Sequence, residues 1–249
     1  MTLRFIDLFC GIGGFRIALE NAGCKCVFSC DIDNEARETY YKNFNEMPAG
    51  DISKIKSNEI PEHDILCAGF PCQPFSISGK QGGFNDTRGS LFYEIARIAK
   101  DKQPSILFLE NVANLEKHDK GRTLETIENS LDQIGYNVYW KILNASDFGV
   151  PQARKRIYFV CLKKDKYHTD FKFPEPSKEN IYLKDIINYN TKIVKDCIVK
   201  RNDTILWDEK IKEIKKMKER KRPIQIGIVN KGGQGERIYS IDGHGITLS

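Results

Sequence analysis

Short apolar segments alternate with longer amphipathic segments along residues 1–162, and this alternation limits the folds open to the chain. The apolar segments have the length of buried strands, and the segments between them have the periodicity of helices. Strands that alternate with helices are typical of βαβ units and a parallel sheet. The sequence therefore predicts an α/β fold with a mostly parallel, doubly wound sheet. The predicted strands span residues 4–9, 26–29, 65–68, 106–109, 136–143 and 156–162, and the predicted helices span residues 15–21, 33–43, 90–100 and 124–134.

The alternation stops after residue 162, which predicts a second and smaller region. Residues 163–177 are polar and include Pro174 and Pro176, so they read as a linker. Beyond this linker we expect a charged helix over residues 208–222 and strands over residues 224–229 and 237–241. We therefore divide the chain into residues 1–175 and residues 176–249.

Charge is distributed unequally between the two parts of the chain. Residues 1–162 hold 19 Lys and Arg against 21 Asp and Glu, a net charge of −2, whereas residues 163–249 hold 20 against 13, a net charge of +7. A basic segment beside an acidic body favours a catalytic body joined to a segment that binds a polyanion. A solvated, lysine-rich surface would give the same count.

The chain shows no targeting, membrane or metal pattern. No apolar run approaches the roughly 18 residues of a membrane helix, and Asp7 interrupts the first apolar run, which argues against a signal peptide. We therefore expect a cytoplasmic protein without a membrane partner. The eight cysteines lack the spacing of a zinc site, and a reducing compartment would keep them as thiols. We expect no metal.

The first predicted strand runs into a glycine-rich turn at Gly11, Gly13 and Gly14, which a predicted helix follows. This is the shape of a nucleotide-binding turn, in which glycines let the backbone approach a ligand. Asp31 ends the next strand about twenty residues later, where a carboxylate can accept both hydroxyls of a ribose. Asp51, at a further predicted strand end, could meet an adenine amino group. These positions fit an adenosine ligand, but they leave a dinucleotide and S-adenosylmethionine equally open.

Cys72 follows the apolar strand at residues 65–68 and is flanked by Pro71 and Pro74. This placement puts Cys72 at the carboxyl edge of the sheet, where α/β proteins form their sites, and makes it a candidate thiolate nucleophile. Residues 76–89 are rich in Gly, Ser and Gln and include Lys80 and Arg88. This segment is long enough to act as a lid.

An acid and two arginines complete the candidate catalytic set. Glu110 lies at the end of the neighbouring predicted strand, where it could donate a proton near Cys72. Arg154 and Arg156 are two residues apart, so on a strand both side chains would point to the same face. There they could orient an acid or bind phosphate.

Four blocks of the sequence resemble the DNA cytosine-5 methyltransferase family of bacterial restriction–modification systems. Residues 5–15 are similar to the family's first cofactor block, residues 69–76 to its catalytic loop, residues 110–112 to its acid block and residues 152–156 to its arginine block. The order and spacing of the blocks agree over about 150 residues. The resemblance implies a Rossmann-like S-adenosylmethionine-dependent methyltransferase domain over residues 1–175. It implies a small, partial target-recognition region over residues 176–249.

The resemblance also implies a reaction and a cofactor. Cys72 would add to carbon 6 of a cytosine flipped out of duplex DNA, and carbon 5 would take the methyl group of S-adenosylmethionine. Glu110 would bind the cytosine ring, Arg154 would contact the base, and Arg156 would hold the groups that surround the covalent adduct. Ile32 stands where a family member has a tryptophan stacked on adenine, and it would cover that face less well. The implied cofactor-binding residues are Phe9, Gly11, Gly13, Gly14, Asp31, Ile32, Asp51, Ile52, Pro71 and Leu91.

The implied partner is double-stranded DNA, which methylation would protect from a cognate restriction endonuclease. Gln234 would fill the space left by the flipped base, and Arg237 would contact a guanine. The likeness of residues 232–240 to a family member suggests a GC-rich site such as GCGC. The implied DNA-binding residues are Ser76, Ser78, Lys80, Arg88, Gln234 and Arg237.

Two alternatives remain open. A tRNA cytosine-5 methyltransferase shares this catalytic core, although the basic second region with its Gln and Arg loop favours DNA. The other alternative is a truncated or split-enzyme subunit that binds DNA and is inactive alone, because the family normally continues past Ser249. In that case a complementary C-terminal polypeptide is a further partner, and the isolated chain is expected to bind S-adenosylmethionine weakly.

Overall fold

A six-stranded sheet forms the centre of the larger part of the molecule. The computed structural model describes residues 2–71, 91–177, 179–188, 201–214, 216–217, 222–233 and 235–247. The strands lie in the order β2-β1-β3-β4-β6-β5. β1 pairs in parallel with β2 and β3, and β3 with β4, whereas β6 runs antiparallel to β4. The predicted mostly parallel α/β fold is confirmed. The bounds of the strands are β1 Arg4–Leu8, β2 Lys25–Cys30, β3 Ile65–Gly69, β4 Ile106–Val112, β5 Tyr136–Asn144 and β6 Lys155–Lys163.

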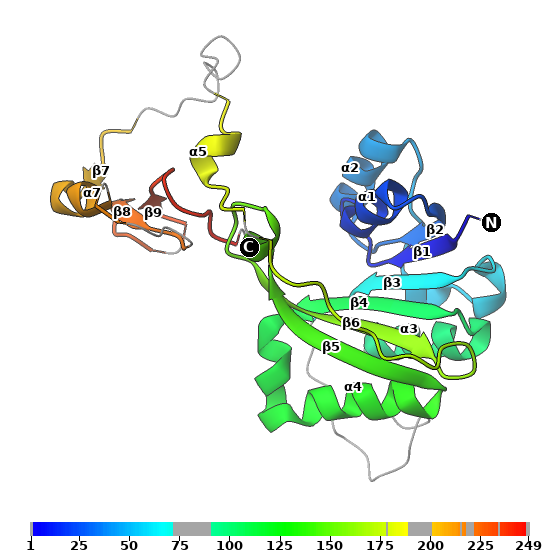
Figure 1. Ribbon diagram of the computed structural model, residues 1–249. Helices are drawn as coiled ribbons and strands as arrows, with labels where there is room; N and C mark the ends of the chain where they lie inside the picture. The colour runs from blue at the N-terminus through cyan, green and yellow to red at the C-terminus, as the bar shows by residue number, and fades with distance from the viewer. Residues whose placement is uncertain are drawn as a thin grey trace. The chain divides into compact units, whose positions relative to one another are not determined.

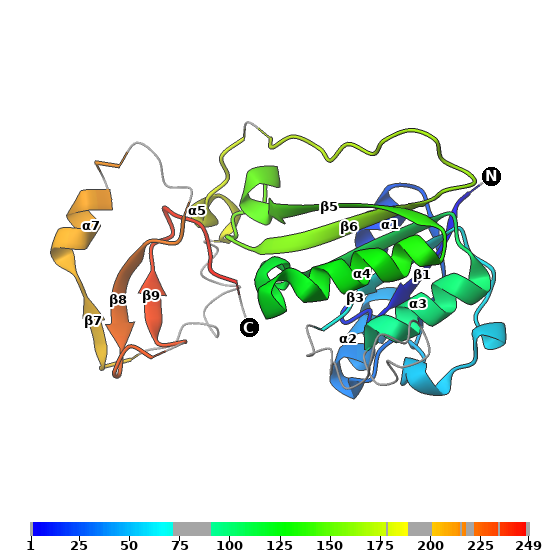
Figure 2. The same ribbon diagram turned by 90° about the horizontal axis from the view of Figure 1, so that it is seen from below.

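Helices cover both faces of this sheet (Figures 1 and 2). On one face, α3 (Leu91–Lys102) and α4 (Arg122–Gln133) pack against the sheet and enclose the larger apolar core, which includes Leu8, Leu66 and Leu107. The other face packs α1 (Gly14–Asn21) onto a smaller core around Phe5 and Cys67. Successive side chains along each strand point to opposite faces, so neighbouring residues enter opposite cores, as expected for a doubly wound sheet.

The remaining elements of this part lie in its connections. α2 (Asn34–Phe44) lies beside α1, and the Arg16 guanidinium of α1 lies over the rings of Tyr40 and Phe44 in α2. The described 3-10 helices of this part are η1 (Ile52–Lys54), η2 (Ser57–Glu59) and η4 (Ala113–Gly121). No helix in the described ranges is long and apolar enough to cross a membrane.

The chain forms two compact units. The first comprises Met1–Ile142 and Arg156–Phe173, and the second comprises Leu143–Lys155 and Pro174–Ser249. The second unit contains an antiparallel sheet in the order β7-β8-β9, with β7 Thr204–Leu206, β8 Gln225–Val229 and β9 Arg237–Tyr239. The helices among the described residues of this unit are α5 (Leu183–Ile186), α7 (Asp208–Ile214) and the 3-10 helix η5 (Ala145–Phe148).

Two local expectations were wrong. The charged helix predicted over residues 208–222 ends at Ile214, the one residue of α7 that is buried, and Lys216 already lies in a turn. Asp51 does not end a strand. Its neighbourhood makes only an isolated bridge between Ala49 and Cys30, and Asp51 instead precedes η1.

Candidate active site

The glycine-rich turn at the carboxyl end of β1 has an unusual backbone. Phe9, Gly11 and Gly13 all have positive φ, at 55°, 52° and 97°. A non-glycine residue rarely adopts this conformation, and such positions concentrate at ligand sites. The Gly11 amide donates to Oδ2 of Asp31 over 2.8 Å, and the Asp33 amide donates to Oδ1 over 2.9 Å. Asp31 therefore joins the turn to the end of β2.

The same turn leaves space for a ligand on one side. A Cβ atom added to Gly11 or Gly14 would meet no atom within 4 Å, whereas one added to Gly13 would lie 2.2 Å from Cε2 of Phe44. Ile32, directly after Asp31, is 72% exposed. The open backbone, the Asp31 carboxylate and the exposed apolar Ile32 fit the glycine turn, ribose and adenine contacts expected of an adenosine ligand.

Asp51 and Ile52 contribute in a different way from the one expected. Oδ1 of Asp51 accepts hydrogen bonds from the Ser53 amide and hydroxyl, at 3.0 and 2.7 Å, and these bonds lower the pKa of Asp51. Asp51 is thus the N-cap of η1. The Ile52 side chain is buried in the main core, so it anchors η1 to that core. The Asp31 amide donates to the Ala49 carbonyl, which sets this segment beside the end of β2.

Glu110 and Arg156 form an ion pair at the carboxyl end of β3. Nε of Arg156 lies 2.8 Å from Oε1 of Glu110, and both side chains are largely shielded, at 14% and 20% exposed. Gly69 faces Glu110 across the β3–β4 pairing, and a Cβ at Gly69 would lie 3.6 Å from Oε2 of Glu110. Gly69 therefore places the Glu110 carboxylate in close contact with the backbone of the strand that leads to Cys72.

Asn111 anchors the chain directly before Cys72. Its buried amide donates from Nδ2 to the Phe70 carbonyl over 2.9 Å, and its Oδ1 accepts from the Val112 amide over 2.8 Å. Phe70 is buried and Pro71 is exposed, so the chain leaves the core between these two residues. Leu91, which is half-buried, opens α3.

Several predicted residues lie outside the described part of the chain. They are Cys72, Ser76, Ser78, Lys80, Arg88 and Gln234.

The two arginines of the predicted arginine block do not share a strand. β6 begins at Lys155, so Arg156 lies on it and Arg154 precedes it, in the second compact unit. The Arg154 carbonyl accepts from the Ala145 amide. The preceding residues are fastened within the same unit, because Gln152 pairs with Gly245 and the Thr247 hydroxyl donates to the Ala153 carbonyl over 2.9 Å.

Arg237 lies exposed at the first position of β9. The turn before it is braced by Glu236, whose Oε2 accepts from the Gly233 amide over 2.7 Å and whose Oε1 accepts from Nδ2 of Asn230 over 3.0 Å. These bonds lower the pKa of Glu236. The backbone amide of Asn230 in turn donates to the Asp203 carboxylate, which also accepts two hydrogen bonds from Arg201. Asn230 and Glu236, on either side of the Gly233 position, are therefore both held by side-chain hydrogen bonds.

Comparison with known proteins identifies the family. Residues 3–241 match the C-5 cytosine-specific DNA methylase family. The chain belongs to this family. The type II methyltransferase M.HhaI of Haemophilus parahaemolyticus is 48% identical over 247 residues, which cover 99% of this chain and 74% of that relative. M.HpaII of Haemophilus parainfluenzae is 54% identical over 186 residues, which cover 73% of this chain and 52% of that relative.

A solved methyltransferase structure resembles this chain in its fold. A putative DNA modification methyltransferase encoded within a prophage of E. coli matches with a TM-score of 0.61 and 26% identity. The match covers 74% of this chain and 54% of that one. The chain thus spans about three quarters of M.HhaI and about half of the other two relatives.

Three residues that support the site were not predicted as site residues from the sequence. Asp7 is a buried carboxyl on β1, and burial raises its pKa well above the usual value, although the backbone and guanidinium of Arg16 lower it. Its signal was a carboxylate inside an apolar run. Asn111 adjoins Glu110 and could have been found as a buried amide at a strand end. Arg97, described below, gave no signal, because a single arginine on an amphipathic helix reads as a solvated residue.

Proposed function

We propose that this chain is a DNA cytosine-5 methyltransferase of the restriction–modification type. The observation that supports this function best is the shielded Glu110–Arg156 pair, which faces Gly69 at the end of the strand that leads to Cys72. An acid and a nucleophile at neighbouring strand ends can act on one planar ring bound between them.

The cofactor in this proposal is S-adenosylmethionine, which supplies the methyl group when bound. The turn at Gly11 and Gly14 would approach the cofactor through its backbone, with Phe9, Gly13 and Pro71 beside it. Asp31 would accept from the ribose hydroxyls, and Ile32 would cover the adenine. Asp51 and Leu91 would complete the adenine side of the pocket, and Ile52 would support that side from the core.

The reaction depends on addition of the Cys72 sulfur to carbon 6 of a flipped-out cytosine. Formation of the sulfur–carbon bond makes carbon 5 nucleophilic, and Glu110, held by Arg156, binds the ring nitrogen and stabilises the charge that develops. After carbon 5 has gained the methyl group it loses its proton to solvent or a base. The electron pair of that C–H bond then expels the Cys72 thiolate, which restores the aromatic ring as 5-methylcytosine.

The DNA contacts of the proposal come from two regions. Ser76, Ser78, Lys80 and Arg88 would contact the substrate from the segment after Cys72. Arg154 would contact the base, and Gln234 and Arg237 would read a GC-rich site such as GCGC, which the family resemblance of residues 232–240 suggests. Methylation would then protect this site from a cognate endonuclease.

A covalent trap tests the proposal. The chain is incubated with S-adenosylmethionine and duplexes in which the target cytosine carries fluorine at carbon 5, including a GCGC duplex. Fluorine cannot leave as a proton does, so the sulfur–carbon adduct persists through denaturing electrophoresis and mass spectrometry. We expect an adduct that Cys72→Ser abolishes and that Cys24→Ser, at a partly exposed free thiol, preserves.

Three other outcomes would contradict the proposal. An adduct that survives Cys72→Ser would refute the assigned nucleophile. Labelling of tRNA but not duplex DNA by a radioactive methyl donor would place the chain among the RNA methyltransferases. Binding to duplex DNA without any adduct would favour a subunit that needs a complementary polypeptide.

A further inference from the structure

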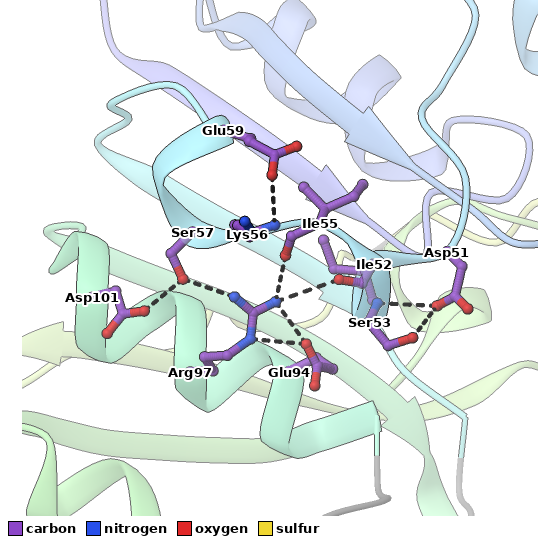
Figure 3. Close-up of polar contacts among 10 residues, drawn as sticks. All are labelled: Asp51, Ile52, Ser53, Ile55, Lys56, Ser57, Glu59, Glu94, Arg97 and Asp101. Carbon is purple, nitrogen blue, oxygen red and sulfur yellow. Dashed lines mark hydrogen bonds and ion pairs between the residues drawn. The ribbon is translucent and has the colours of Figure 1, made fainter.

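Arg97 on α3 holds the backbone of the segment that follows Asp51 (Figure 3). Its Nη2 donates to the Ile55 carbonyl over 3.0 Å and to the Ile52 carbonyl over 3.4 Å. These carbonyls lie at the two ends of the single turn of η1. The guanidinium therefore satisfies the Ile55 carbonyl just past the end of η1, and it adds a second bond to the Ile52 carbonyl, which also accepts from the Ile55 amide within η1.

Neighbouring side chains fix the guanidinium in this position. Oε2 of Glu94 accepts from Nε and Nη2 of Arg97, at 2.9 and 2.7 Å. Nη1 of Arg97 donates to the Ser57 hydroxyl over 2.8 Å, and that hydroxyl donates to Asp101 over 2.5 Å. Glu94, Arg97 and Asp101 lie on one face of α3, because residues three and four apart are neighbours on a helix. This face of α3 thus grips residues 52–57 from one end to the other.

The gripped segment begins at a candidate cofactor position. Asp51 caps η1 through Ser53, so the orientation of its carboxylate is tied to the geometry of the turn that Arg97 closes. Two different groups therefore hold η1. Asp51 accepts from the Ser53 amide at its start, and Arg97 donates to the Ile52 and Ile55 carbonyls. α3 also begins at Leu91, so one rigid helix supplies a pocket residue and the clamp on the opposite segment.

We infer that Arg97 is a positioning residue that preorganises the adenine side of the cofactor pocket, an inference that rests on the proposed function. Arg97 holds the turn at Asp51–Ile52 in its binding conformation before the ligand arrives. Without it, the ligand must order this turn, and the cost of ordering appears as weaker binding. Because the clamp acts on the adenosine-binding side, it affects every ligand that contains adenosine.

The fork of the arginine side chain is what the site requires. Five donors in a plane reach Glu94, Ser57 and two carbonyls at once, whereas a lysine ammonium presents one compact centre. We therefore expect Arg97→Met to weaken binding of S-adenosylmethionine about tenfold, which equals about 1.4 kcal/mol. Arg97→Lys should retain part of the affinity.

Arg122 offers a matched control. It pairs with Asp119 three residues earlier, as Arg97 pairs with Glu94, but it stands at the exposed start of α4. Arg122→Met therefore removes an equivalent pair without touching residues 52–57. It should leave cofactor binding unchanged.

The experiment measures binding of S-adenosylmethionine and S-adenosylhomocysteine to the full chain by calorimetry, together with the thermal midpoint and the Kd for duplex DNA. We expect both cofactor Kd values to rise in Arg97→Met and the DNA Kd to stay as in the wild type. Hydrogen exchange should quicken at the amides of Lys54 and Ile55, which bond within η1. A merely structural role would lower the thermal midpoint without changing the Kd of the folded protein.

Each remaining outcome is decisive. Wild-type affinity in folded Arg97→Met overturns the inference and leaves the proposed function intact. Should Arg97→Met fail to fold, Arg97→Lys decides in its place, because unchanged affinity in that variant with quickened exchange at η1 also overturns the inference. A wild-type chain that binds neither ligand overturns the proposed function itself.

Discussion

At the scale of single residues, Asn111 shows how a buried side-chain amide can hold the backbone at Phe70, two residues before the candidate nucleophile Cys72. It satisfies the Phe70 carbonyl on one side and the Val112 amide on the other. Asn111→Ala leaves the Phe70 carbonyl unpaired in a buried site, so we expect a loss of about 1–3 kcal/mol in the free energy of unfolding. Urea denaturation measures this loss. We also expect slower formation of the fluorocytosine adduct, because the residue before Pro71 loses its anchor.

The control for Asn111 is Asn43→Ala. Asn43 also donates to a backbone carbonyl, that of Ile12 over 3.2 Å, but at an exposed position where water can replace it. The free energy of unfolding should change by less than about 0.5 kcal/mol. Equal losses in the two variants would show that burial of the Phe70 carbonyl is unimportant.

Asp7 gives a prediction about pH. Burial raises the pKa of this carboxyl in the folded protein, so the folded state keeps a proton that the unfolded chain releases above pH 4 or so. The stabilisation from this proton is complete below the unfolded pKa and is lost as pH rises toward the folded pKa. Where only the folded state holds the proton, the loss approaches about 1.4 kcal/mol per pH unit.

Asp7→Asn should therefore flatten the pH dependence of stability. The amide stays neutral at every pH, so the free energy of unfolding should fall less between pH 5 and pH 8 than in the wild type. Denaturant titrations at the two pH values measure this difference. An unchanged difference would mean that Asp7 is ionised in the folded protein.

At the scale of elements, the turn between β1 and α1 depends on Gly13 for two separate reasons. Gly13 has a φ of 97°, and an added Cβ would lie 2.2 Å from the Phe44 ring. Gly23 has a φ of 82° but open space at its Cβ, so Gly23→Ala incurs only the backbone strain. We expect Gly13→Ala to lower the thermal midpoint more than Gly23→Ala, and to weaken binding of S-adenosylmethionine. Equal midpoints would show that Phe44 moves aside freely.

The elements that could be predicted from the sequence are those whose own residues mark their ends. β1 is an apolar run that ends in glycines, and α2 begins after Asp33, which caps it. The antiparallel direction of β6 could not be predicted, because a buried apolar strand has the same pattern in either direction. The end of α7 at Ile214 depends on where packing stops, which a run of lysines does not reveal.

The same distinction applies to the site. Asp31 was recognisable because its strand and the glycine turn are local signals, and the structure joins them through the Gly11 amide. The role of Asp51 as a cap, and the clamp by Arg97 some 45 residues away in sequence, depend on tertiary contacts between segments with no shared pattern. Sequence periodicity reports the face that a residue occupies and says nothing of the distant backbone that it meets.

At the scale of the whole molecule, the uneven charge predicts how binding to DNA depends on salt. The basic residues 163–249 have a net charge of +7, so contacts with phosphates should release counterions and make the logarithm of affinity fall linearly with the logarithm of salt concentration. Lys231 lies exposed in the turn before β9. If it contacts one phosphate, Lys231→Gln should reduce the magnitude of this slope by about one and weaken all duplexes alike.

Arg237→Gln should behave differently, since a base contact adds discrimination. We expect it to weaken a GCGC duplex by about 1–3 kcal/mol relative to an unrelated duplex. Fluorescence anisotropy between 50 and 200 mM salt measures both effects. Lys102→Gln, whose ammonium pairs with Glu62 in the acidic body, is the control and should leave slope and discrimination unchanged. If Lys102→Gln lowers the slope as much as Lys231→Gln does, the phosphates contact the body of the protein, and the charge asymmetry belongs to its solvated surface.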